Sequence, residues 1–211
     1  MKINKKTFVL SLAVCLLPLV AGALLYAKLP ERIPIHFNFA GEPDGYGGKA
    51  FALFAIPSLM TLLQAIFPFL LRADPKSANM SKALFLVAIW TVPTISVLCN
   101  AMSLGYALGY DMNVSVVIST FVGLIFVVIG NYLPKTKQSY TMGIKLPWTL
   151  NSEENWNRTH RLAGFLWVFC GAAFILFSLL RLLNLYLFLV LLFAMILIPT
   201  AYSYYLYRKG I

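Results

Sequence analysis

Long apolar runs alternate with short polar segments along the whole chain. Six of these runs are long enough to cross the hydrocarbon core of a bilayer, which takes roughly 20 helical residues. They cover residues 7–29, 50–71, 83–110, 113–133, 162–183 and 185–207. The runs show no sustained two-residue alternation, so the pattern does not indicate the strands of a membrane barrel. We therefore predict an all-α fold, a polytopic membrane bundle of six transmembrane helices.

The composition agrees with a membrane protein. Hydrophobic residues make up 60% of the chain and charged residues only 11%, whereas a soluble domain has about 25% charged residues. Gln64 and Asn100 are the main polar side chains within the predicted spans. Proton- or ion-coupled transport usually needs ionisable groups within the membrane, so their scarcity there argues against a transporter or channel. Cys15, Cys99 and Cys170 each lie inside a span and are expected to be small packing residues.

The distribution of basic residues predicts the orientation. With the N-terminus inside, the outer segments would contain only Lys28, Arg32, Lys49 and Arg181 of the 17 basic residues, and the rest, beginning with Lys2, would lie inside. The positive-inside rule then predicts a multi-pass protein of the cell membrane with both termini in the cytoplasm. This asymmetry and the attraction to anionic lipid account for the net charge of +10. No nucleic-acid partner is expected.

The most informative polar segment is residues 29–49, here named the first loop and predicted to lie outside and to be structured. The alternation of Ile33, Ile35 and Phe37 with other residues predicts a short strand. Residues 42–45 form a turn signal, with proline second and glycine last.

Six side chains of the first loop are candidates for ligand binding: His36, Asn38, Glu42, Asp44, Tyr46 and Lys49. Of these, His36, Glu42 and Asp44 are residue types that can hold a transition metal. The alternative is a hydrogen-bond network that caps the bundle. The chain contains no HExxH zinc motif, phosphate-binding loop or GxSxG nucleophile motif, so no catalytic residue, metal site or cofactor is predicted.

The second loop, residues 134–161, is predicted to lie in the cytoplasm. Asn151 and Glu154 have the spacing of a capping box, which predicts a helix from there toward the fifth span. Trp148 and Trp156 suit either the lipid headgroup layer or a docking surface for a partner protein, and His160 is expected to be solvated. The partner-binding candidates in and just before this loop are Asn131, Lys145, Trp148, Thr149, Trp156, Arg158 and Arg161.

Both loops carry a resemblance to known bacterial membrane proteins. In the first loop the residues concerned are Leu29-Pro30, Ile33-Pro34-Ile35-His36-Phe37-Asn38, Gly41-Glu42-Pro43-Asp44-Gly45-Tyr46-Gly47 and Lys49. They resemble the signature of a small membrane domain of unknown function that commonly precedes the SdpI-type immunity module. A second set resembles that module itself: Gly130-Asn131-Tyr132-Leu133-Pro134-Lys135, Gly143-Ile144-Lys145-Leu146-Pro147-Trp148-Thr149-Leu150, Trp156 and Thr159-His160-Arg161-Leu162-Ala163-Gly164. Usual members have arginine in place of Lys145 and threonine in place of Leu146.

The resemblance implies two domains, residues 1–110 and 111–211. Because no linker between the spans is long enough to separate them, we expect one compact bundle. It also implies that the protein protects a Gram-positive cell from a secreted antimicrobial peptide and sequesters an ArsR-type repressor at the membrane when the toxin is present. In this interpretation the first loop binds or blocks the peptide toxin, and the second loop couples to the cytoplasmic partner. Two alternatives stay open: a membrane-embedded metal-dependent enzyme that uses His36, Glu42 and Asp44, and a transporter that exports the peptide.

Overall fold

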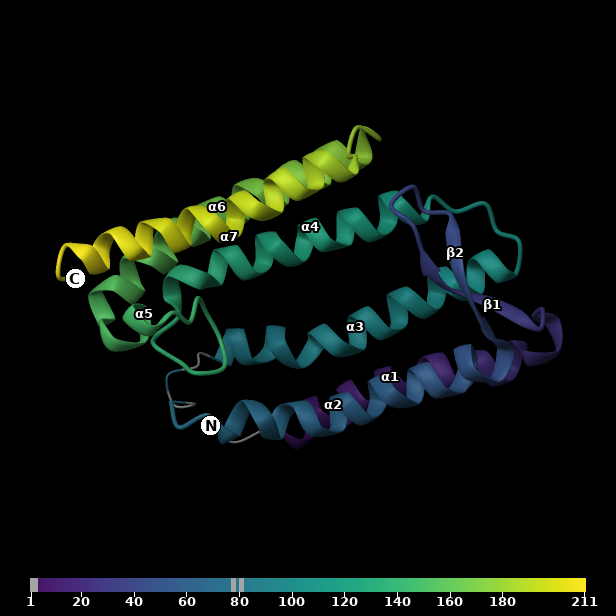
Figure 1. The fold of residues 1–211 in the computed structure, drawn as a ribbon. Helices are drawn as coiled ribbons and strands as arrows, with labels where there is room; N and C mark the ends of the chain where they lie inside the picture. Colours follow the sequence, from purple (N-terminus) through teal and green to yellow (C-terminus); the bar gives the residue numbers. More distant parts are fainter. Residues whose placement is uncertain (1–3, 77–78, 80–81) are drawn as a thin grey trace. The chain divides into compact units, whose positions relative to one another are not determined.

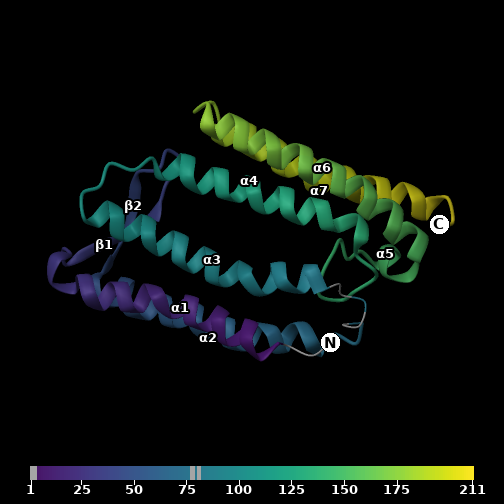
Figure 2. The same cartoon turned by 180° about the vertical axis from the view of Figure 1, so that it is seen from behind.

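The computed structural model describes residues 4–76, 79 and 82–211 of the chain. Within them are six helices long and apolar enough to cross a membrane (Figures 1 and 2). These span Lys5–Lys28, Phe51–Ala73, Lys82–Ala107, Val114–Lys135, Glu153–Leu179 and Leu185–Arg208. Large apolar side chains such as Leu59, Phe165 and Val190 stay exposed on them, as expected for surfaces that face lipid. The predicted all-α membrane fold with six spans is confirmed. Lys2, one of the basic residues used to predict the orientation, lies outside the described residues.

The described residues form two compact units. The first contains residues 4–73 and 82–114, and the second contains residues 74–76, 79 and 115–211. The domain boundaries inferred from the sequence, and the single compact bundle, stay predictions.

The first unit is built on three helices: α1 (Lys5–Leu25), α2 (Ile56–Ala73) and α3 (Lys82–Ala107). Each of them packs against the other two. The amide of Gln64 is fully buried among them and donates to Ser11 Oγ at 2.8 Å and to the Ile89 carbonyl at 3.1 Å. Through its Nε2 group Gln64 ties the three helices together, whereas its Oε1 is buried without a hydrogen-bond partner among the described residues.

A hairpin connects α1 to α2. The chain leaves α1 through the short helix η1 (Tyr26–Lys28), forms the strands β1 (Arg32–Phe37) and β2 (Pro43–Gly48), and enters α2 through the π-helix η2 (Phe51–Ala55). The strands are antiparallel, with Arg32 opposite Gly48 and Phe37 opposite Pro43. The predicted strand is confirmed, and the first loop is structured.

The predicted position of the turn is wrong. Residues 43–45 belong to β2, and the chain reverses between Asn38 and Glu42. The Asn38 N–H donates to the Glu42 carbonyl at 2.8 Å, and Gly41 adopts φ +85°. Glycine takes this left-handed conformation without steric cost, so Gly41 sets the turn earlier than the proline signal suggested.

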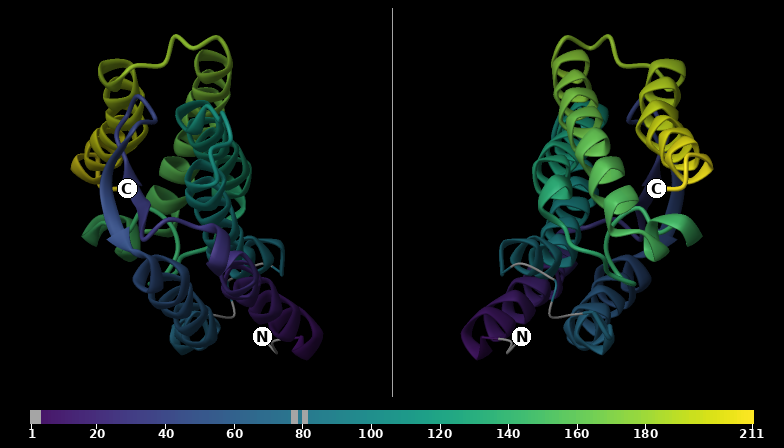
Figure 3. Two further views of the ribbon diagram at one scale, coloured as in Figure 1. Left: turned by 90° about the vertical axis from the view of Figure 1, so that its right-hand side faces the viewer. Right: turned by 90° about the vertical axis from the view of Figure 1, so that its left-hand side faces the viewer.

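The second unit contains α4 (Val114–Tyr132), η4 (Leu133–Lys135), α5 (Pro147–Asn151), α6 (Glu153–Leu179) and α7 (Leu185–Arg208). Helices α6 and α7 lie side by side (Figure 3). Their core is formed by the buried side chains of Cys170, Phe174 and Met195. Phe126 of α4 adds an edge-to-face contact with Phe174, with ring centroids 5.5 Å apart, so all three long helices share this core.

Helix α6 begins as predicted within the second loop, but its cap is different. Asn151 is the last residue of α5, and Ser152 is the N-cap of α6. The Ser152 hydroxyl accepts from the Asn155 N–H at 3.1 Å. Glu153 and Glu154 lie in the first turn, where the helix dipole favours acids. The predicted capping box from Asn151 is therefore wrong by one residue, because α5 continues through Asn151.

Candidate functional site

The first loop exposes a histidine–carboxylate pair. His36 Nδ1 lies 2.5 Å from Asp44 Oδ1, and the two side chains are 70% and 47% exposed. They lie on neighbouring strands at an irregularity of the ladder, where His36 pairs with Gly45. A Cβ at position 45 would approach the His36 Cβ to 2.9 Å, so glycine leaves room for the histidine. The pair therefore presents its polar atoms to solvent.

A second polar pair lies at the turn of the hairpin. Asn38 Oδ1 accepts from the Glu42 N–H at 3.0 Å, and Asn38 Nδ2 donates to Glu42 Oε2 at 3.3 Å. Glu42 and Asp44 therefore bind different partners. Over residues 4–76, 79 and 82–211, no three His, Cys, Asp or Glu side chains are grouped so that they could hold a metal ion.

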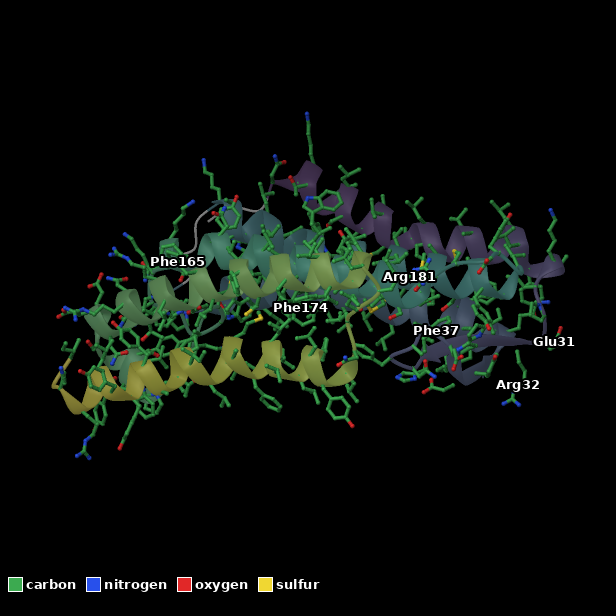
Figure 4. The ribbon with its side chains drawn as sticks, turned by 90° about the horizontal axis from the view of Figure 1, so that it is seen from above. Glu31, Arg32, Phe37, Phe165, Phe174 and Arg181 are labelled. Atoms are coloured by element: carbon green, nitrogen blue, oxygen red, sulfur yellow. The ribbon has the colours of Figure 1, made fainter. Side chains whose placement is uncertain are left out.

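The two remaining candidates of the first loop differ in exposure. Tyr46 on β2 is 47% exposed. Lys49 is only 7% exposed and lies at the base of the hairpin. Its ammonium is 3.5 Å from Glu31 Oε1 and 4.4 Å from the centre of the Tyr26 ring. Lys49 thus stabilises the base of the hairpin, whereas Tyr46 shares its open surface. In Figure 4, Glu31 marks the base of the hairpin, and Arg32 and Phe37 mark the two ends of β1.

In the second unit, Asp74 organises the start of the second loop. Its Oδ2 accepts from the hydroxyls of Ser139 at 2.7 Å and Thr141 at 2.8 Å and from the N–H groups of Tyr140 and Thr141, both at 3.0 Å. Burial raises the pKa of Asp74, but hydrogen bonds from Ser139, the Lys76 backbone and Thr141 outweigh this and lower the pKa from 3.8 to about 2. Asp74 therefore stays ionised and holds residues 139–141 in place.

Trp156 and His160 form the buried centre of the second loop. Both are fully buried, and their rings stack with centroids 4.0 Å apart. The indole donates to the Thr136 carbonyl at 2.8 Å. The Ile144 N–H donates to His160 Nε2 at 2.9 Å, which assigns the ring proton to Nδ1, 2.8 Å from the Trp156 carbonyl. The expectations of a solvated His160 and of a surface-exposed Trp156 are therefore wrong, because the loop folds back over both rings.

A second network joins α5, α6 and α7. Trp148 Nε1 donates to Ser203 Oγ at 2.8 Å, and Ser203 Oγ donates to Asn155 Oδ1 at 2.6 Å. Asn155 Nδ2 also donates to the Ile211 carbonyl at 3.1 Å. Thr149 is fully buried and accepts from the Leu146 N–H at 2.9 Å. The candidates Trp148 and Thr149 thus have structural partners within the unit.

The remaining candidates of the second unit are exposed. Lys145 and Asn131 lie on its surface. Arg158 forms an ion pair with Glu154, with Nη2 of the arginine 2.6 Å from Oε1 of the glutamate. Arg158 and Arg161 border an open cleft of about 800 Å³ along α6, which Tyr202 of α7 also lines. These basic side chains are the part of the predicted docking surface that solvent, lipid or a partner can reach.

Sequence reasoning missed Asp74, Asn155 and Ser203. Asp74 is the only acid between the second and third spans, and that isolation among basic residues was a signal for a specific role. Asn155 and Ser203 are 48 residues apart, and nothing in their local sequences indicates that they meet. Their pairing depends on how α7 returns along α6.

Comparisons with known proteins agree with the motifs of the two loops. Residues 13–61 match a domain of unknown function (DUF1648), and residues 135–203 match the SdpI/YfhL protein family. The chain is 30% identical over 208 residues to the immunity protein SdpI of Bacillus subtilis (strain 168), with 97% of each protein covered. No solved structure matches the chain. The resemblance inferred from the loop residues is confirmed.

Proposed function

Because the chain belongs to the SdpI/YfhL protein family, we propose that it is an immunity protein that protects its host cell from a secreted antimicrobial peptide. The observation that carries the proposal is the 30% identity, over 97% of the chain, to a relative named as an immunity protein. Similarity over that length includes both loops and all six spans, so it supports a shared role of the whole protein.

The first loop is the surface that we propose for contact with the toxin. Six consecutive spans alternate in direction, so the loop after the first span and the loop after the fourth lie on opposite sides of the membrane. The many basic residues near the second loop support a cytoplasmic location for it. The first loop then faces outward, where a secreted peptide arrives. Its exposed His36, Asp44 and Tyr46 supply hydrogen-bonding and aromatic contacts.

We propose that protection works by binding, without catalysis. A metal-dependent reaction at the first loop would require His36, Glu42 and Asp44 to converge on one ion. In the hairpin, Asp44 pairs with His36 and Glu42 pairs with Asn38. Two separate pairs support a recognition surface more than a reaction centre.

Signalling through an ArsR-type repressor stays a prediction about the second loop. The surface that could carry it consists of the exposed Lys145, Arg158 and Arg161 together with the half-buried Trp148. Trp156 and Thr149 are buried and serve the loop itself.

Expression in a sensitive host tests the proposal. Cells that make the protein are expected to tolerate a secreted antimicrobial peptide better than cells with an empty vector. The double variant Glu42→Ala, Asp44→Ala is expected to lose tolerance at equal membrane levels. Glu154→Ala is the matched control, because it also removes an exposed, paired acid. If no peptide from a panel of secreted toxins is tolerated better, immunity is refuted. If the double variant protects fully, the first loop is not the toxin site.

A further inference from the structure

Helix α3 carries a polar face within its membrane span. Ser96, Asn100 and Ser103 are spaced by four and three residues, so they lie on one side of the helix about one turn apart. They belong to the half of α3 that approaches the hairpin, where Phe37 of β1 contacts Tyr106 with ring centroids 5.7 Å apart. Polar groups within a membrane span are costly and usually mark a functional site.

This polar face lines a cavity of about 240 Å³ within the first unit. On the opposite side the cavity is apolar, with walls from η2 and the first turns of α2, including Leu53, Pro57 and Met60. Ile33 and Ile35 of β1 also line it, so the hairpin covers the cavity and connects it to the first loop. The cavity therefore combines one polar wall with several apolar ones.

The three polar side chains make no hydrogen bond to any part of the chain that the structure describes. Their neighbours differ: Thr91 donates to the Val87 carbonyl at 2.8 Å, and Thr94 donates to the Trp90 carbonyl at 2.7 Å. Ser96 is only 5% exposed, so its hydroxyl faces the cavity rather than bulk solvent. A polar group without a partner in an apolar medium is energetically costly, and a ligand with its own polar atoms would remove that cost.

We propose that this cavity receives a short apolar segment of a peptide, whose backbone amides bond to Ser96, Asn100 and Ser103 while its side chains enter the apolar part. The inference rests on the proposed immunity function, for which it names the mode of toxin binding. A lipid acyl chain would fill the apolar space but offers no hydrogen-bonding group to three polar side chains in a row. A peptide presents amide groups at regular intervals along its backbone.

The size of the cavity limits what enters it. At about 240 Å³ it lies below the range of about 300–1,000 Å³ typical of pockets for drug-sized ligands. About one or two residues of a peptide therefore insert, and the rest of the toxin remains at the hairpin. The exposed His36–Asp44 pair on that hairpin is then placed to contact the part that does not insert.

The chain contains a native reporter for this site. Cys99 lines the cavity and is exposed, whereas Cys15 is fully buried and Cys170 is 3% exposed. This corrects the expectation that all three cysteines only fill packing space. Alkylation of Cys99 by N-ethylmaleimide in lipid nanodiscs, followed by intact mass, reports whether the cavity is open. A Cys99→Ser variant identifies the labelled site.

The test uses the capped dipeptide acetyl-leucyl-leucinamide, with decane as an apolar comparator that has no amide. At ten times its dissociation constant the dipeptide leaves about a tenth of the cavities empty, so labelling is expected to slow about tenfold. Decane is expected to have little effect. Asn100→Leu, close in volume, is expected to remove the protection, and Ser103→Ala to weaken it. Thr94→Val is the control from the same helix and should behave like the wild type.

The inference is overturned if the dipeptide leaves labelling unchanged, if decane protects equally well, or if Asn100→Leu and Ser103→Ala are protected as fully as the wild type. Toxin tolerance of the same variants separates this result from the proposed function. If cells tolerate the toxin but the dipeptide does not slow the labelling of Cys99, the cavity is refuted as the toxin site and the immunity function stands. If the dipeptide slows the labelling of Cys99 but the cells gain no tolerance of a toxin, immunity is refuted and a peptide-binding cavity stands.

Discussion

Gly123 on α4 and Gly171 on α6 face each other with no side chain between the two helices. A Cβ on Gly123 would lie 2.8 Å from the Gly171 carbonyl oxygen, and a Cβ on Gly171 would lie 2.7 Å from the Gly123 carbonyl oxygen. Small residues at such contacts allow helices to approach closely in membranes. Seven residues along each helix, Gly130 and Gly164 make a similar contact. The backbones of α4 and α6 are therefore in direct contact over two helical turns.

Gly171→Ala is expected to destabilise the second unit, because the new methyl group meets backbone that cannot move aside. Overpacking of this kind costs roughly 1–3 kcal/mol, which exceeds the gain of up to about 1 kcal/mol in helix propensity. Thermal unfolding in detergent measures the effect. Gly48→Ala is the control, because nothing lies within 4 Å of a Cβ there. Equal unfolding temperatures for the two variants would contradict the close contact.

Gly143→Ala is expected to displace the second loop from α6. Gly143 has φ +110°, and a Cβ would lie 2.6 Å from His160 Nε2 and 2.7 Å from the Trp156 ring. Gly109→Ala is a matched control, since its φ is +82° with nothing within 4 Å. Both variants carry the backbone strain of a left-handed alanine, so only the steric clash differs. Trp fluorescence should report a more solvated indole in Gly143→Ala alone; similar spectra for both would refute the packing of the loop.

Asp74→Asn is expected to loosen residues 139–141. The amide replaces a carboxylate that accepts several hydrogen bonds, and hydrogen bonds to charged groups contribute roughly 1.5–3 kcal/mol each. Limited trypsin digestion at Lys137 and Lys145 measures the exposure of the segment. Asp111→Asn removes a charge from an exposed acid and should leave digestion unchanged. Faster cleavage in both variants would point to net charge as the cause.

The hydrogen bonds of Asp74 also predict that the folded second loop is less stable in acid. The pKa of Asp74 is lowered from 3.8 to about 2 in the folded protein, so the unfolded chain takes up the proton first as the pH falls. The stabilisation by Asp74 is therefore complete above a pH of about 4 and is lost progressively toward pH 2. Digestion by pepsin across that range should accelerate in the wild type, and Asp74→Asn should show a smaller change. If Asp74→Asn keeps the full pH dependence, other titrating groups cause it.

Trp156→Ala is expected to unfold the second loop rather than to remove a docking contact alone. Truncation of a buried tryptophan costs about 3–5 kcal/mol. Phe165→Ala is the control, because Phe165 lies on the same helix but is 72% exposed (Figure 4). The yield of folded protein in size-exclusion chromatography should fall for Trp156→Ala only. Normal folding of that variant would restore the prediction of Trp156 as a surface anchor.

The orientation can be tested by labelling with a membrane-impermeant maleimide in intact cells. In a background without native cysteines, Asp44→Cys is expected to react and Lys145→Cys is expected to be spared, because the first loop is predicted outside and the second inside. Both side chains are exposed in the fold, so differences in burial do not explain the result. The reverse pattern would invert the topology.

The parts of this protein that depend on local pattern could be predicted from the amino-acid sequence. Continuous apolar runs specify membrane helices because the backbone must satisfy its hydrogen bonds within each span. The two polar loops and the family could also be recognised from the sequence, because the residues that identify them lie close together along the chain. Within the first loop, the strand at residues 32–37 followed from its alternation.

Which polar side chains are buried, and which are accessible to a ligand or partner, became clear from the packing of the folded chain. Trp156 and His160 read as surface residues because their neighbours are polar, yet the return of residues 136–144 covers both rings. The sequence placed Asn100 in a span without indicating its surroundings, yet it lines a cavity together with η2, the first turns of α2 and β1. Burial depends on segments that are distant in the chain, and local sequence does not specify how those segments meet.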